Sequence, residues 1–179
     1  MKTKKEKSFI PCASRRQFLL MGGTATATVL LPGLKGIGAE KVEAAVMSRY
    51  PRVKIGSVRK LKTDKPLVFN YPDKSKFSKS ILVKLGTRAG GGVGPHTDIV
   101  AFNSFCTHQG GKLSDLYKRK DKAIGPCPYH LSTFDLTRHG IIVAGHATES
   151  LAQVVLETKG DDIYAVGVIG LIYGRNSNV

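Results

Sequence analysis

Beyond residue 45 the chain consists of short apolar runs separated by Gly, Pro, Asn and Asp, and it shows no long helical period. Each run has about the length of a β-strand. Many short strands at close spacing predict an antiparallel all-β sandwich or barrel. The predicted strands are Val53–Ser57, Pro66–Tyr71, Ile81–Leu85, Asp98–Phe105, Gly140–Gly145, Gln153–Thr158, Asp162–Val168 and Leu171–Tyr173.

The segments between these runs carry further local signals. Lys159-Gly160-Asp161 separates two β-branched runs, which predicts a hairpin turn. Leu113–Lys118 is compatible with a helical turn. The glycine-rich stretch 89–95 predicts a loop, and its glycines do not open a helix, so the pattern does not favour phosphate binding.

The first segment has the pattern of an export signal. Ser14-Arg15-Arg16-Gln17-Phe18-Leu19 follows a lysine-rich start and precedes an apolar run from Phe18 to Leu31. This twin-arginine pattern predicts a signal over residues 1–44, cleaved after Ala39 or Ala44, or retained. The run is shorter than the ~20 residues of a membrane span. Chance arginines ahead of a buried helix are the alternative.

Export predicts a periplasmic protein, or one on the outer face of the cytoplasmic membrane, with membrane association only if the signal is retained. It also makes a cofactor inserted before translocation more plausible. Of the three cysteines, Cys12 lies ahead of the arginine pair, so a cleaved chain keeps Cys106 and Cys127. Three cysteines are too few for a disulfide scaffold, although the remaining two are able to form one disulfide in an oxidising compartment.

Charge adds a separate constraint. The 179 residues hold 28 Lys and Arg against 13 Asp and Glu, a formal charge of +15, and residues 40–179 remain basic without the signal. A basic body suggests acidic partners. Tryptophan is absent and the aromatic residues are scattered, which does not favour a nucleic-acid surface. The basic run 118–122 is interpreted as a solvated loop tip.

Two short motifs carry the candidate chemistry. Cys106-Thr107-His108 and Cys127-Pro128-Tyr129-His130 are separated by 18 residues, and glycine and proline flank both. Each motif supplies one thiolate and one imidazole, so two tight loops are able to hold one metal centre from opposite sides. Three interpretations compete: a zinc site with two Cys and two His, a structural disulfide with incidental histidines, and a Rieske [2Fe–2S] cluster.

The segments C-T-H-Q-G-G-K-L-S-D-L and G-P-C-P-Y-H-L-S-T-F-D-L resemble the cluster-binding fragment of Rieske proteins. The resemblance implies an antiparallel Rieske-type fold over residues 45–179, with a small cluster-binding subdomain made of two loops at about 104–136. It implies one [2Fe–2S] cluster per chain, with Cys106 and Cys127 on the inner iron and His108 and His130 on the outer iron. The other histidines in this region, His96, His139 and His146, match no motif position and are expected to be surface or loop residues.

Departures from the commonest Rieske pattern narrow the choice of branch. Quinol–cytochrome c oxidoreductases usually tie their cluster loops with a disulfide, but Gly111 and Tyr129 occupy the matching positions here. Ser132 matches a serine that donates to a bridging sulfur. Phe134 replaces a tyrosine that donates to a ligand. Because one of these two hydrogen bonds is missing, we expect a potential in the lower or middle part of the Rieske range.

Three further parts of the chain resemble the small subunit of arsenite oxidase: residues 92–95 with 98–102, residues 145–153 and residues 170–175. This resemblance implies an electron-transfer subunit without substrate chemistry of its own. It would take electrons from a large molybdopterin catalytic subunit and pass them to a c-type cytochrome or a small copper protein. The alternatives are the small subunit of an iodate reductase and the Rieske subunit of a quinol–cytochrome c oxidoreductase; a zinc-stabilised binding module is a third class.

Overall fold

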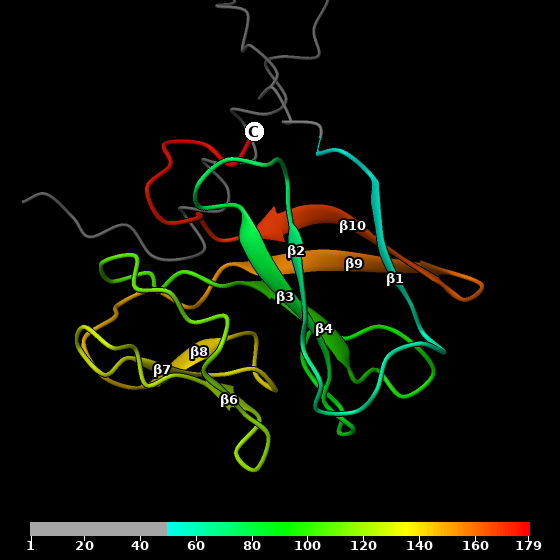
Figure 1. Ribbon diagram of the computed structural model, residues 1–179, viewed down its shortest axis with the longest axis horizontal. Helices are drawn as coiled ribbons and strands as arrows, with labels where there is room; N and C mark the ends of the chain where they lie inside the picture. The colour runs from blue at the N-terminus through cyan, green and yellow to red at the C-terminus, as the bar shows by residue number, and fades with distance from the viewer. Residues whose placement is uncertain (1–49) are drawn as a thin grey trace, which may run out of the picture. The chain divides into compact units, whose positions relative to one another are not determined.

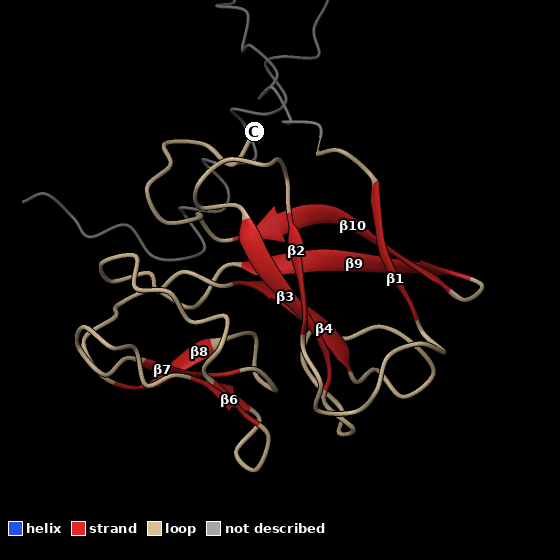
Figure 2. Cartoon of the chain, in the orientation of Figure 1, coloured by secondary structure: helices blue, strands red, loops and turns tan. Residues whose placement is uncertain are grey.

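The computed structural model describes residues 50–179, which form ten β-strands and no helix (Figures 1 and 2). The predicted export signal lies outside the described residues. No helix in the described part has the length and apolar character that crossing a bilayer requires. The strands are β1 Val53–Ser57, β2 Leu67–Asn70, β3 Lys79–Lys84, β4 Ile99–Asn103, β5 Tyr117–Lys118, β6 Ala123–Ile124, β7 Thr133–Asp135, β8 Ile141–Ala144, β9 Gln153–Lys159 and β10 Asp162–Ile169.

Six strands form one antiparallel sheet in the order β1-β10-β9-β4-β3-β2. Its central strand β4 is buried along its whole length, as its apolar sequence IVAFN requires. The predicted hairpin turn joins β9 to β10, where Lys159 pairs with Asp162 and Gly160 takes a φ of 60°. One face of this sheet covers a core that includes Leu82, Ile99 and Ile163.

The other four strands form a smaller antiparallel sheet in the order β5-β6-β7-β8. In Figure 1 this sheet occupies the lower left, and the loops that carry the two motifs lie at its ends. A second core packs beneath it, and this core contains Cys106 and Cys127 together with Phe134 and Leu136. The small sheet thereby positions both cysteine loops.

The all-β antiparallel prediction is confirmed, and seven of the eight predicted strands match observed strands to within about two residues. The prediction of a strand at Leu171–Tyr173 is wrong: these residues form an irregular segment that is anchored by the Asn178 side chain, which accepts from the Ile172 N–H at 2.9 Å. At Leu113–Lys118 a single turn closes between the Leu116 N–H and the Leu113 carbonyl, and β5 follows directly.

Candidate metal centre

The two motif loops have the same backbone hydrogen-bond pattern. The Cys106 N–H donates to the carbonyl five residues later, in Gly111, and the Cys106 carbonyl accepts from Gly110 N–H, each at 2.8 Å. Cys127 repeats both bonds with Ser132 and Leu131, at 2.8 and 2.9 Å. Each loop therefore forms a closed turn around its cysteine, which holds the sulfur and the following histidine in a fixed relation.

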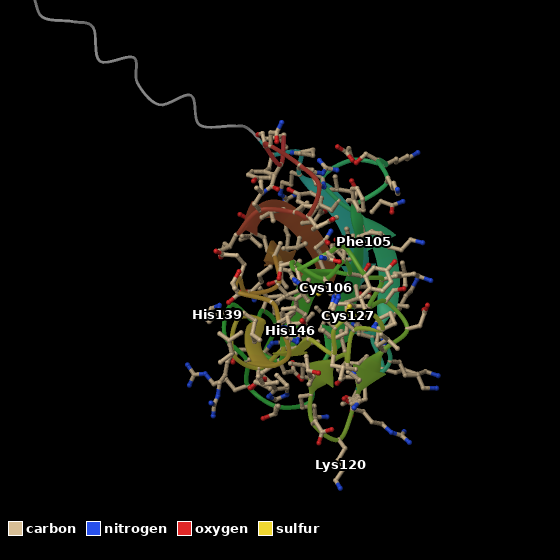
Figure 3. All side chains as sticks on the ribbon, turned by 90° about the vertical axis from the view of Figure 1, so that its left-hand side faces the viewer. Phe105, Cys106, Lys120, Cys127, His139 and His146 are labelled. Atoms are coloured by element: carbon tan, nitrogen blue, oxygen red, sulfur yellow. The ribbon has the colours of Figure 1, made fainter. Side chains whose placement is uncertain are left out.

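The two loops lie against each other with the sulfurs inside and the imidazoles outside. Cys106 and Cys127 are free thiols with 1% of their surface exposed. His108 and His130 are half-buried, and their ring centroids lie 4.6 Å apart. Figure 3 shows the two cysteines close together within the fold. The structure thus brings together all four residues of the two motifs.

Burial raises the pKa of the Cys106 thiol, and the neighbouring sulfur of Cys127 raises it further. The backbone N–H of His108 and the hydroxyl of Ser132 act in the opposite direction, because both donate hydrogen bonds to the Cys106 sulfur. Two buried sulfurs lie side by side, and hydrogen-bond donors already point at the sulfur of Cys106. Such a pair suits a metal cation, which displaces the thiol protons when it binds.

The imidazole of His130 supplies an independent observation. Its Nδ1 atom is buried and has no hydrogen-bond partner, although nearly all buried polar atoms in proteins are paired. A metal–nitrogen bond would satisfy this atom. Within residues 50–179 no three His, Cys, Asp or Glu side chains are grouped closely enough to hold a single ion. A [2Fe–2S] cluster does not require such a group, because each iron takes two protein ligands. The residues present fit the predicted cluster.

A third loop, residues 145–149, closes over the two motif loops. The Ser132 hydroxyl oxygen, which is fully buried, accepts the backbone N–H groups of His146 and Ala147 at 3.2 and 3.0 Å. The Thr107 hydroxyl donates to the Glu149 carbonyl at 2.8 Å. Both lone-pair sites of Ser132 are therefore occupied, and its proton is left for the Cys106 sulfur.

His146 is the functional candidate that the sequence did not identify. It is an exposed loop residue, as expected, but its ring centroid lies 6.0 Å from those of both His108 and His130. No spacing rule links it to the two motifs. The sequence signals were the family resemblance of residues 145–153, which did not single out this histidine, and Gly145, whose φ of 92° fits it to a tight turn directly before His146.

Gly111 and Tyr129, the two positions at which the sequence predicted no disulfide between the loops, lie directly against the site. A β-carbon placed on Gly111 would lie 2.5 Å from the Cys127 sulfur, and the Tyr129 ring is the next contact. Phe134 is fully buried in the core that contains both cysteines. Ser132 thus lies against the third loop, and Phe134 shares the core of the two cysteines; the tuning role of both residues stays a prediction.

The other two histidines outside the motifs lie away from the site. His96 is an exposed loop residue. His139, at the turn before β8, shares a 2.8 Å hydrogen bond with Gln153, and Gln153 donates to the Gly90 carbonyl. His139 thus links the small sheet to the large one.

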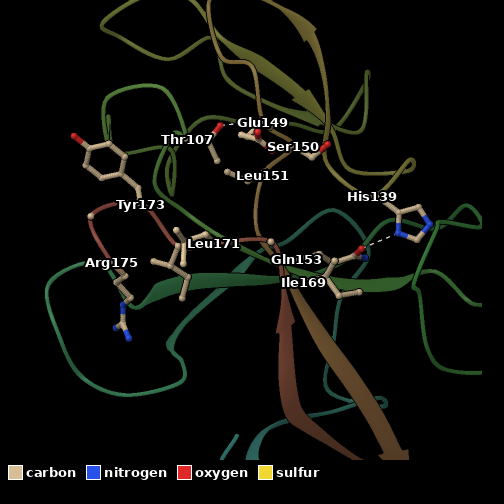
Figure 4. A pocket seen from close by; sticks show the side chains of 13 residues that line it. Thr107, His139, Glu149, Ser150, Leu151, Gln153, Ile169, Leu171, Tyr173 and Arg175 are labelled. Carbon is tan, nitrogen blue, oxygen red and sulfur yellow. Dashed lines mark hydrogen bonds between the residues drawn. The ribbon is translucent and has the colours of Figure 1, made fainter. Parts of the chain in front are cut away.

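A cavity of about 680 Å³ adjoins the site on one side (Figure 4). Its walls come mainly from residues 149–153 and the C-terminal segment 169–175, and the apolar side chains of Ile169 and Leu171 are exposed in it. Of the residues of the two motifs, only Thr107 lines the cavity. The candidate site therefore lies beside this cavity and not at its floor.

Comparison with known proteins gives one family. The model of the Rieske [2Fe-2S] domain matches residues 52–165. The iodate reductase subunit IdrB of Denitromonas iodatirespirans is 59% identical over 167 residues, covering 93% of this chain and 87% of that protein. The iodate reductase subunit IdrB of Pseudomonas sp. (strain SCT) is 55% identical over 166 residues, covering 93% and 84%. Among solved structures, the soluble domain of Rieske protein II from Sulfolobus acidocaldarius has a TM-score of 0.61 at 23% identity, covering 71% of this chain and 82% of that one.

Proposed function

The chain belongs to the Rieske [2Fe–2S] domain family, and we propose that it is the electron-transfer subunit of an iodate reductase. The observation that carries this proposal is the 59% identity to an iodate reductase subunit over 93% of the chain. The sequence predicted arsenite oxidase first and iodate reductase as the alternative, and both relatives carry the name of the alternative. A reductase also reverses the predicted direction: electrons enter from a soluble carrier and leave to the catalytic subunit.

The residues of the site have distinct roles in this function. Cys106 and Cys127 hold the inner iron and His108 and His130 the outer iron, as the burial of the sulfurs and the free Nδ1 of His130 suggest. When bound, the cluster supplies a one-electron centre in the Rieske range of about −150 to +300 mV. Ser132 donates to the Cys106 sulfur and so favours the more negative, reduced state.

The catalytic partner is proposed to be a large molybdopterin subunit; its support is that both relatives are named as one subunit of an iodate reductase. The test is co-expression of the chain with the molybdopterin subunit, followed by purification through a tag on this chain alone. Iodate should then oxidise the reduced centre of the complex, and arsenite should leave the oxidised centre unchanged. Both reactions are monitored by the visible absorption of the centre. Reduction by arsenite would assign the chain to an arsenite oxidase. A colourless chain that purifies alone would contradict both assignments.

Export by the twin-arginine route completes the proposal, because the partner and the carrier would then meet this chain outside the cytoplasm. Its support is the pattern around Arg15 and Arg16. Replacement of both arginines by lysine should leave the folded, coloured chain in the cytoplasmic fraction. Unchanged appearance in the periplasm would contradict this route.

A further inference from the structure

Two basic runs that lie more than fifty residues apart in the sequence meet on one surface. The first is in the β1–β2 loop and the second in the β5–β6 hairpin. Lys122 Nζ contacts both carboxylate oxygens of Asp64, at 2.7 and 2.8 Å. The Tyr117 hydroxyl donates to the same carboxylate at 2.6 Å. Asp64 therefore fixes the hairpin to the loop and joins their charges into one patch.

We define the basic patch as six cationic residues around this contact: Lys62, Lys65, Lys118, Arg119, Lys120 and Lys122. Only two carboxylates, Asp64 and Asp121, lie within its two segments, and Asp64 already forms an ion pair with Lys122. The other five cations are exposed and form no ion pair with any residue from 50 to 179. Asp115, which borders the patch, is paired with Lys112 at 2.8 Å. The patch therefore keeps a strong positive field toward solvent.

The patch belongs to the part of the fold that carries the centre. Tyr117 reaches Asp64 with its hydroxyl, and its ring packs against the core that contains Cys106 and Cys127. In Figure 3 Lys120 lies at the end of the hairpin, at the bottom of the molecule, clearly separated from His146 and the two cysteines above it. A protein bound at the patch would leave the exposed imidazole edge accessible.

The surface around that imidazole edge has a different character. Tyr129 and Leu131, which flank His130 in the chain, are 60% and 65% exposed. Apolar surface of this kind suits a permanent subunit interface, which is generally less polar than a transient one. A surface of unpaired lysine and arginine suits fast, reversible encounters, because complementary charge raises association rates more than affinity.

We propose that the basic patch is the docking surface for an acidic, soluble electron-carrier protein. The proposal rests on the electron-transfer function proposed above and adds the face and the charge of the carrier. The carrier's acidic face meets Lys118, Arg119 and Lys120 on the hairpin and Lys62 and Lys65 on the loop. The catalytic subunit then has the apolar surface around the imidazoles, so both partners bind at the same time.

The test compares two redox proteins of opposite charge, an acidic plastocyanin and a basic mitochondrial cytochrome c. Binding to the immobilised full chain and the rate of electron exchange with its reduced centre are both measured against ionic strength. The test variant is Arg119→Glu/Lys120→Glu. The matched control is Lys74→Glu/Lys76→Glu, which makes the same charge change on another exposed loop.

With the unaltered chain, the rate for plastocyanin should fall as salt is added, and the rate for cytochrome c should not. Arg119→Glu/Lys120→Glu should slow plastocyanin about tenfold or more at low ionic strength and weaken its binding. The control variant should have a much smaller effect. Equal losses in both variants would show that net charge alone matters and would overturn the proposal.

Two further outcomes separate the alternatives. If the hairpin variant loses binding to vesicles that contain anionic phosphatidylglycerol but exchanges electrons with plastocyanin normally, the patch is a membrane-binding surface and the proposal is wrong. If the reduced chain exchanges electrons with neither protein, the electron-transfer function itself has failed. Normal exchange without charge dependence would overturn only the docking surface.

Discussion

Gly110 and Leu131 occupy the same position in the two matched cysteine loops, and both have a left-handed backbone, with φ of 67° and 60°. Glycine adopts this conformation without strain, whereas for a leucine it carries a conformational strain of about 1–2 kcal/mol. In the first loop a side chain is also excluded by space, because a β-carbon on Gly110 would overlap the Tyr173 ring. In the second loop Leu131 is 65% exposed beside His130.

We therefore predict that Leu131→Gly raises the free energy of unfolding by about 0.5–1 kcal/mol, since relief of strain exceeds the entropy cost of glycine. Chemical denaturation measures this change. Val143→Gly is the matched control, because Val143 is similarly exposed but has no left-handed backbone, and it should destabilise the protein. A loss of stability in Leu131→Gly would contradict the strain argument. If Leu131 also contacts the catalytic subunit, the stabilised variant should co-purify with less of that subunit.

Ser132→Ala should lower the midpoint potential without loss of the cluster. The hydroxyl oxygen accepts two backbone N–H groups of the third loop, so its proton is directed at the Cys106 sulfur. The serine hydroxyl stabilises the reduced state, and the alanine removes this donor. The alanine also leaves two backbone N–H groups without a partner, which lowers the free energy of unfolding by about 1–3 kcal/mol. Voltammetry of the purified chain measures the potential. Ser80→Ala, a buried serine away from the site, should reduce stability and leave the potential unchanged.

Phe134→Tyr should raise the midpoint potential. The ring is fully buried in the core that contains both cysteines, and a new buried hydroxyl needs an acceptor. A ligand sulfur is the acceptor that we predict. Phe102→Tyr makes the same chemical change elsewhere in this core and should affect stability alone. An unchanged potential in Phe134→Tyr would show that the phenol does not reach a sulfur.

The sequence predicted the long strands well because each of their apolar runs is long enough to identify a strand without any tertiary contact. Strand Val53–Ser57 has the predicted bounds, and Asp162–Ile169 exceeds its prediction by one residue. Strands β5, β6 and β7 were not predicted. They have only two or three residues, too few to show a period of two, and they are strands because the fold pairs them.

The same distinction applies to the site. Spacing and residue type were sufficient to group the two motifs, since each motif is local in the chain, and the role of their residues as ligands stays a prediction. The third loop was not predicted, because its contacts with Ser132 and Thr107 depend on β8 leading back to the cysteine loops. The basic run 118–122 was correctly expected at an exposed tip. Its meeting with Asp64 required the tertiary structure.

Acid should destabilise the protein partly through Asp73. The Arg175 guanidinium, with the Ser78 hydroxyl and the Ser75 N–H, holds the pKa of this carboxyl well below its usual range. The folded state therefore favours the ionised form. The resulting stability is fully present above the unfolded pKa of about 3.9 and is lost as the pH falls toward the lower folded value.

Asp73→Asn should lower the free energy of unfolding by about 1 kcal/mol at neutral pH. The loss is modest because the carboxyl is half-exposed. The substitution should also flatten the fall in unfolding free energy below about pH 4, measured by denaturant titration at a series of pH values. Glu157→Gln, which breaks an exposed pair with Arg52, is the control and should leave the profile unchanged. An unaltered acid profile in Asp73→Asn would contradict the assignment.

The choice of outer-iron ligands is tested by comparing histidines within one fold. His108→Ala and His130→Ala should each abolish the Rieske EPR signal, because the outer iron would then lose one of its two protein ligands. His139→Ala should leave the signal intact, since that ring is bonded to Gln153 and links the two sheets. His146→Ala should also retain it, although its ring lies 6.0 Å from both predicted ligands. A signal that survives His130→Ala but disappears in His146→Ala would transfer the ligand role to the third loop.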